Sequence, residues 1–224
     1  MKKPPREIDA MSKFEELAGA PPKLHFWGGE WRVGGLGPPQ IALLQRSMTA
    51  VGLSSRIIET GAGLSTLLML ALGARVTSFF TKEDLRARIV DAIVAHHLPS
   101  ENWEPVLGSS EFTFPKYLDT HPRLSCDLVL IDGGHLIHTV FTDFTFAFSC
   151  LKQGGLMLID DLQTPTVSVL YEVLKSATFV EQVDVAGKLV AFRKKVKARL
   201  PGVVGEFSLG NVDLTKIAAD LNSN

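Results

Sequence analysis

Three aspartates follow two apolar runs of the sequence and could hold a metal ion. Asp132 comes directly after the run at 126–131, and Asp160 and Asp161 follow the run at 156–159. If these runs are neighbouring parallel strands, about 4.8 Å apart, their acids converge at one edge of the sheet. Carboxylates gathered at one place repel one another unless a cation holds them. Because oxygen donors suit a hard ion such as Mg²⁺, the three aspartates are candidate metal ligands.

His135, three residues after Asp132, is a candidate general base. Histidine accepts a proton near neutral pH, so it can deprotonate a substrate hydroxyl. Simpler interpretations stay open for the same residues. Asp132 can contact a cofactor while Asp160 and Asp161 cap the next helix, where acids are favourable in any case. His135 can serve only to anchor its loop.

A glycine turn forms a second candidate site. The strand-like run that ends in Glu59 is followed by Gly61 and Gly63, and then by an apolar helix. In open α/β sheets a nucleotide-like ligand sits at the carboxyl end of such a strand. Glycines let a ligand approach the main chain, and Ser65 or Thr66 can cap the helix. The alternative is a turn whose glycines serve chain reversal only.

The elements that would position these residues alternate between strand and helix. We expect strands at 56–59, 75–80, 104–107, 126–131 and 156–159, then a hairpin of 179–185 and 188–193. We expect helices at 8–17, 40–51, 64–73, 82–97, 138–151 and 167–176, with a loop at 108–124 that holds one helical turn. Such alternation implies a parallel sheet with helices on both faces, and the hairpin implies an antiparallel edge strand. The predicted fold is α/β: a doubly wound, mostly parallel seven-stranded sheet with an antiparallel C-terminal hairpin strand.

One domain, residues 37–194, should hold all of these motifs. Residues 1–36 form an N-terminal extension. Its aromatic, glycine-rich segment at 25–37 is typical of an irregular loop, either a lid over a ligand or a cover over the core. Residues 195–224 carry a basic run and a weak helix at 214–221. We interpret them as a peripheral tail that is available for forming a homo-oligomer.

Composition narrows the classes of function. The chain has 224 residues, is 46% hydrophobic and has a formal net charge of −1, which leaves no electrostatic footprint for nucleic acid or an anionic membrane. Cys126 and Cys150 lie among apolar residues and indicate buried thiols in a reducing compartment. No secretory signal is recognisable, and the most apolar window, at 64–74, is shorter than the about 20 residues that a bilayer requires. We expect a soluble cytoplasmic protein with a small-molecule substrate.

The ordered motifs resemble class I S-adenosylmethionine (SAM)-dependent methyltransferases. E-T-G-A-G-L-S-T at 59–66, L-I-D-G-G-H at 130–135 and L-K-Q-G-G-L-M-L-I-D-D at 151–161 occur in the order typical of that family. Within the class, the chain resembles the metal-assisted O-methyltransferases of small molecules, such as the catechol and caffeoyl-coenzyme A types and their antibiotic- and sugar-modifying relatives. The resemblance implies a Rossmann-like fold, SAM and a divalent metal (Mg²⁺ above all) as cofactors, and methyl transfer to a hydroxyl. A dinucleotide-binding turn fits less well, because Thr66 stands where G-x-G-x-x-G has its third glycine.

The resemblance also implies roles for individual residues. It places cofactor-binding residues after the first, third and fourth strands of the domain: Glu59, Gly61, Gly63, Ser65, Ser109, Ser110 and Asp132. In that arrangement Glu59 orients the methionine amino end of SAM, and the two serines after the third strand meet its adenine. His135 lies where relatives carry a lysine or histidine base, so His135 and Asp132 are the catalytic candidates.

One position departs from the family pattern. Phe80 stands at the end of the second strand, where the family usually has an acid that binds the ribose hydroxyls. Loss of a charge-assisted acceptor weakens binding by about 1.5–3 kcal/mol, unless Glu83 reaches back from the next helix. Two alternatives therefore stay open. Beside the metal-assisted O-methyltransferase, the chain can be a metal-independent class I methyltransferase or a methyltransferase-like binding subunit with weakened catalysis.

Overall fold

The computed structural model of the chain describes residues 5–121 and 124–197. The helices are α1 (Pro5–Gly19), α2 (Pro38–Val51), α3 (Leu64–Ala71), α4 (Glu83–Ala95), α5 (Ser110–Thr120), α6 (Ile137–Cys150) and α7 (Pro165–Lys175). The strands are β1 (His25–Trp27), β2 (Glu30–Arg32), β3 (Arg56–Thr60), β4 (Arg75–Phe80), β5 (Trp103–Leu107), β6 (Cys126–Ile131), β7 (Leu151–Ile159), β8 (Val180–Ala186) and β9 (Leu189–Lys194). The weak helix expected at 214–221 lies outside the described residues.

The main sheet has seven strands in the order β5-β4-β3-β6-β7-β9-β8. The first five are parallel, and β9 runs antiparallel to both of its neighbours. This is the predicted mostly parallel sheet, with one difference. β9 inserts between β7 and β8, so the antiparallel strand is internal and β8 forms the edge. From β3 the chain adds β4 and β5 on one side, and it then returns to add β6 and β7 on the other side. The boundary between β3 and β6 is therefore a topological switch point.

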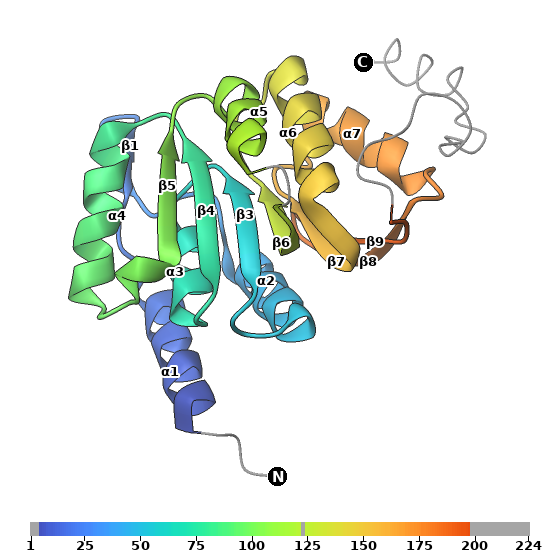
Figure 1. Cartoon of the computed structure of the whole chain (residues 1–224). Helices are drawn as coiled ribbons and strands as arrows, with labels where there is room; N and C mark the ends of the chain where they lie inside the picture. The colour runs from blue at the N-terminus through green and yellow to red at the C-terminus, as the bar shows by residue number, and fades with distance from the viewer. Residues whose placement is uncertain (1–4, 122–123, 198–224) are drawn as a thin grey trace.

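Helices cover both faces of this sheet (Figure 1). Side chains of a strand alternate between its two faces, so neighbouring residues enter different cores. Ile57 packs in the core beneath α1, α2, α3 and α4, whereas Ile58 packs in the core beneath α5, α6 and α7. The second core also contains Cys126 and Cys150, which are buried free thiols as predicted.

Three expectations about the elements were wrong. The segment at 25–37 is not an irregular loop, because it forms the β1–β2 hairpin. The segment at 108–124 contains the helix α5, which buries Phe114 against the ring of Phe79 at a centroid distance of 4.4 Å. The strand expected at 156–159 begins five residues earlier, directly after α6, so β7 contains Gly154 with a φ of 82°.

Within the described ranges, 5–121 and 124–197, no helix combines the length and the apolar character needed to cross a membrane.

Candidate functional site

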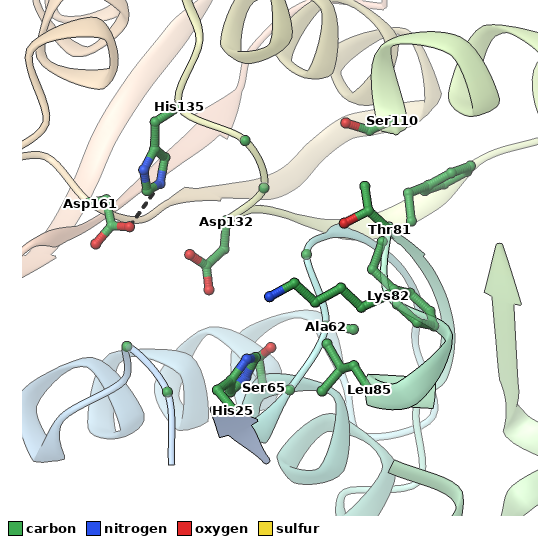
Figure 2. A pocket seen from close by; sticks show the side chains of 18 of the residues that line it. His25, Ala62, Ser65, Thr81, Lys82, Leu85, Ser110, Asp132, His135 and Asp161 are labelled. Atoms are coloured by element: carbon green, nitrogen blue, oxygen red, sulfur yellow. Dashed lines mark ion pairs between the residues drawn. The ribbon is translucent and has the colours of Figure 1, made fainter. Parts of the chain in front are cut away.

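A cavity of about 610 Å³ opens at the carboxyl ends of β3, β4 and β6 (Figure 2). Small-molecule sites usually have volumes of about 300–1,000 Å³. The walls come from the β1–β2 hairpin, residues 34–36, the turns that follow β3 to β7 and the β8–β9 turn. The cavity thus occupies the switch point of the sheet, which is where open α/β sheets bind their ligands.

Gly61 lets the two turns at the switch point touch. Its φ is +90°, and a Cβ there would lie 2.2 Å from the backbone carbonyl oxygen of Asp132. The Gly61 N–H donates to Phe79 O at 2.8 Å, and the Asp132 N–H donates to Thr60 O at 3.0 Å. Gly61 and Gly63 both line the cavity. The structure therefore gives Gly61 a structural role, beside the predicted role in cofactor binding.

Glu59 lies behind the cavity wall and is 0% exposed. Its carboxylate accepts hydrogen bonds from Ser65 Oγ, Thr66 Oγ1 and Ser78 Oγ. Burial raises the pKa of Glu59 to about 7 even though all three hydroxyls favour the ionised form. Thr66 Oγ1 also accepts the Gly63 N–H at 3.0 Å, which satisfies a donor at the start of α3. Of these residues Ser65 and Gly63 reach the cavity, so Ser65 joins the buried acid to the wall.

The three aspartates converge as the sequence predicts. β6 and β7 are parallel neighbours, and Asp132, Asp160 and Asp161 each offer a carboxylate oxygen within 4.8 Å of the others. Asp161 has a φ of +64°, in the left-handed region that aspartate tolerates better than most residues. This backbone turn returns the Asp161 side chain toward Asp160. Metal ligation by the cluster remains a prediction.

Lys188, which the sequence did not indicate, contacts the same cluster. Its Nζ donates to Asp160 Oδ2 at 2.9 Å and also to Asp161 Oδ1. On the other side, His135 Nε2 lies 2.9 Å from Asp161 Oδ2 (Figure 2). Asp161 is therefore held between a lysine and a histidine. Lys188, Asp161, Asp132 and His135 all line the cavity.

Burial and mutual repulsion control the protonation of the cluster. Burial, followed by the charges of Asp160 and Asp161, raises the pKa of Asp132 well above its ordinary value. Burial also raises the pKa of Asp160 despite its hydrogen bond from Lys188. Burial acts in the same direction on Asp161, but hydrogen bonds from Lys188 and Gln163 outweigh it and lower the pKa. The site thus resists carrying three negative charges even with Lys188 in place.

The turn after β5 supplies another wall of the cavity. Ser109 and Ser110 line it as expected for residues that meet a cofactor, together with Glu111, which the sequence did not indicate. Glu111 accepts a hydrogen bond from Thr139 Oγ1 at 2.5 Å, and its Oε1 lies 3.4 Å from His138 Nε2. His138 is thereby drawn toward Glu111 rather than toward His135.

Phe80 lies at the end of β4, where the family pattern has an acid that binds the ribose. Phe80 is buried and stacks on Trp103, with centroids 6.1 Å apart and planes at 16°. Glu83 is exposed and pairs with Arg86 at 3.0 Å, so the idea that it reaches back is wrong. Lys82 instead points into the cavity (Figure 2). This wall is therefore aromatic and basic where the family pattern is acidic.

The β1–β2 hairpin forms a wall of the cavity rather than a cover over the core. His25 and Trp27 line the cavity, and His25 Nε2 lies 2.8 Å from the place that a Cβ on Gly63 would take. Burial and the nearby charges of Lys82 and Arg88 lower the pKa of His25. Trp27 is 46% exposed. That the hairpin acts as a lid stays a prediction.

A family of known proteins matches the central part of the chain. Residues 58–162 match the family described as a methyltransferase domain. The matched segment of this methyltransferase domain begins within β3 and ends just after Asp161, so it includes the glycine turn, His135 and the three aspartates. None of the curated proteins matches the chain.

Solved structures of methyltransferases have the same fold. A TDP-rhamnose 3'-O-methyltransferase of calicheamicin biosynthesis aligns with a TM-score of 0.56 and 16% identity, over 86% of this chain and 96% of that one. The O-methyltransferase from Bacillus cereus in complex with SAH aligns with 0.58 and 16%, over 87% and 93%. An rRNA methylase from Streptococcus thermophilus aligns with 0.55 and 16%, over 73% and 100%. At 16% identity, these likenesses show the Rossmann-like methyltransferase fold.

Proposed function

We propose that the protein transfers the methyl group of SAM to a hydroxyl of a small molecule. The observation that carries the proposal is the cavity at the switch point, whose turns after β3 and β6 lie within the matched methyltransferase domain. Two of the similar structures are described as O-methyltransferases, one acting on a sugar nucleotide and one in complex with SAH. They support the choice of oxygen as the acceptor atom.

The cavity offers SAM a glycine turn, hydroxyls and an acid. Gly63, Ser65, Ser109 and Ser110 line one side, and Asp132 lies at the junction with the carboxylate cluster. Bound SAM supplies a methyl group on a positively charged sulfur, which a nucleophile takes by in-line displacement. The task of the protein is to align the acceptor with that methyl group and to remove the acceptor proton.

His135 is suited to remove that proton. Its Nε2 lies 2.9 Å from Asp161 Oδ2, so the Nε2–H donates to the carboxylate and Nδ1 is left as the proton acceptor. A carboxylate that holds one ring nitrogen fixes the tautomer and stabilises the imidazolium formed by proton transfer. In this proposal His135 is the catalytic base and Asp161 is its positioning residue.

The donor chemistry of the cluster fits a divalent ion. Three carboxylates lie within 4.8 Å of one another, and the buried Oδ1 of Asp160 has no hydrogen-bond partner among the described residues. Asp132, Asp160 and Asp161 would hold the ion, which would supply a Lewis acid that lowers the pKa of the acceptor hydroxyl. The chain's own residues would then fix the orientation of the acceptor.

Calorimetric titration with S-adenosylhomocysteine, the product of SAM, tests the proposal. Ala62 lines the cavity, whereas Ala95 lies exposed at the end of α4. We expect saturable binding of one equivalent, lost in Ala62→Trp because the indole fills the cavity, and retained in Ala95→Trp. Absence of binding to the unmodified protein would contradict the proposal. Binding would justify a screen of hydroxyl-bearing acceptors, with and without a chelator to separate metal-assisted from metal-independent transfer.

The second candidate is a binding subunit that uses the methyltransferase fold without efficient catalysis. Phe80 and Lys82 favour it, because they replace an acidic ribose site with an aromatic ring and a cation. A protein that fails to bind S-adenosylhomocysteine but retains its fold would support this candidate.

For the acceptor, we favour a small molecule over nucleic acid or membrane, since the net charge is −1. Because an rRNA methylase has the same fold, RNA is the competing class of acceptor. A gel-shift assay with structured RNA tests whether the protein binds it. We also propose that the protein is cytoplasmic and forms a homo-oligomer. Cell fractionation and light scattering test them.

A further inference from the structure

Lys188 is held rigidly where it meets the carboxylates. It follows Gly187, whose φ of 60° makes the tight turn between β8 and β9. The Lys188 carbonyl accepts the Leu162 N–H at 3.1 Å, which ties this turn to the segment just after Asp161. The ammonium therefore approaches the cluster from a fixed backbone rather than from a free surface loop.

The ammonium is also enclosed. A Cβ built on Gly35 would lie 2.9 Å from Lys188 Nζ, so the segment before α2 passes directly over it. Below it, the side chain of Asp160 is 0% exposed and that of Asp161 is 15% exposed. Lys188 itself is 22% exposed. An ion pair shielded in this way is screened less by solvent and salt than a surface pair.

Lys188 and His135 together occupy three of the carboxylate oxygens that a metal ion could use, and Asp160 Oδ1 is left without a partner among the described residues. Lys188 Nζ contacts one oxygen of Asp160 and one of Asp161, and His135 takes the second oxygen of Asp161. A divalent ion bound by the same carboxylates would meet the ammonium at short range, where like charges repel strongly. A metal ion and the ammonium thus compete for one position.

We propose that Lys188 is the resident cation of the carboxylate cluster and that it excludes a divalent ion unless its side chain leaves. The inference rests on the proposed function only in taking this cluster as the acceptor end of the cavity. In this proposal Lys188 determines whether a divalent ion can bind at the cluster and assist the reaction.

Mn²⁺ titration of the chelator-treated full-length protein tests this competition. Lys188→Met removes the charge and keeps the length of the side chain. Lys175→Met is the matched control, because Lys175 Nζ pairs with Glu172 at 3.1 Å on α7, away from the cluster. A lost charge-assisted contact is worth about 1.5–3 kcal/mol, so Lys188→Met should bind Mn²⁺ at least about tenfold more tightly than the unmodified protein. Lys175→Met should stay within about twofold.

Two further variants keep the test decisive. Asp160→Asn in the Lys188→Met background should abolish the gain in affinity. Lys188→Gln keeps a hydrogen-bond donor without the charge, and it gives the same comparison if the methionine variant does not fold. Affinity in the Lys188 variants equal to or below that of the unmodified protein would overturn the inference, as would an equal gain in Lys175→Met.

S-adenosylhomocysteine titrated into the same samples separates the two proposals. Cofactor binding without a change in Mn²⁺ affinity refutes the role of Lys188 and leaves the proposed function standing. A gain in Mn²⁺ affinity without cofactor binding does the reverse.

Discussion

Replacing Glu59 by glutamine should stabilise the protein progressively more as pH rises. Glu59 is fully buried, and burial raises its pKa from an ordinary value of 4.5 to about 7. Below pH 4.5 both the folded and the unfolded states are protonated, so Glu59 imposes no penalty. Between pH 4.5 and 7 the unfolded state ionises first, and stability falls as pH rises. Above pH 7 the full cost remains, which is about 3 kcal/mol at 1.36 kcal/mol per pKa unit.

Glutamine fits the hydrogen-bond network without the charge. Thr66 and Ser78 both donate to Glu59 Oε1, while Ser65 donates to Oε2. Thr66 Oγ1 already accepts the Gly63 N–H, and Ser78 Oγ accepts Trp103 Nε1 at 2.9 Å. The amide oxygen of glutamine can take the Oε1 position, and its NH₂ can donate to Ser65 after that hydroxyl rotates. The variant therefore keeps three hydrogen-bonded contacts, and the second amide N–H, which none of these hydroxyls accepts, adds a cost that does not change with pH.

Urea denaturation at pH 4, 6 and 8 measures this effect. We expect the free energy of unfolding of Glu59→Gln, relative to that of the unmodified protein, to rise by about 3 kcal/mol between pH 4 and pH 8. Glu181→Gln, at an exposed site on β8, is the control and should change stability by less than about 0.5 kcal/mol throughout. A difference that does not grow with pH would refute the reasoning. If Glu59 also orients the methionine end of SAM, the stabilised variant should bind S-adenosylhomocysteine more weakly.

Three other substitutions test separate parts of the structure. Gly61→Ala should lower the free energy of unfolding by about 3 kcal/mol, since its Cβ would meet Asp132 O at 2.2 Å, whereas Gly19→Ala, with open space around its Cβ, should be nearly neutral in urea denaturation. Phe114→Ala should cost about 3–5 kcal/mol by the same assay, because the ring is fully buried against Phe79. His135→Asn should lower methyl transfer about 10²- to 10⁴-fold and leave S-adenosylhomocysteine affinity unchanged in calorimetry, and an equal loss of affinity would speak against a base.

The sequence predicted those parts of the fold that depend on local pattern. The run at 126–131 is apolar except for Asp127, the run at 75–80 is rich in residues that favour strands, and β6 and β4 have the predicted bounds. The convergence of the aspartates followed from one rule, that parallel neighbours end at the same edge. The helix α5 was missed because Pro115 lies inside it and its polar residues hide the apolar side that holds Phe114.

The parts of the site that escaped prediction come from distant segments. Lys188 reaches the aspartates because β9 inserts between β7 and β8, an arrangement that the spacing of residues along the chain does not encode. His25 reaches the cavity because residues 25–32 pair as a hairpin over the glycine turn. The sequence predicted that Glu59 contacts the cofactor. The three hydroxyls that donate to its carboxylate come from α3 and β4, and only the structure shows them.

The insertion of β9 also orders the assembly of the protein during its synthesis. In any folding intermediate that lacks residues 180–194, β7 is an open sheet edge whose last four residues are apolar, a surface prone to pairing with other chains. In the same intermediate the acids beside β7 have no Lys188 to neutralise them. One late hairpin closes the edge and supplies the missing charge together, so a nascent chain gains its finished site and its protection from aggregation in a single step.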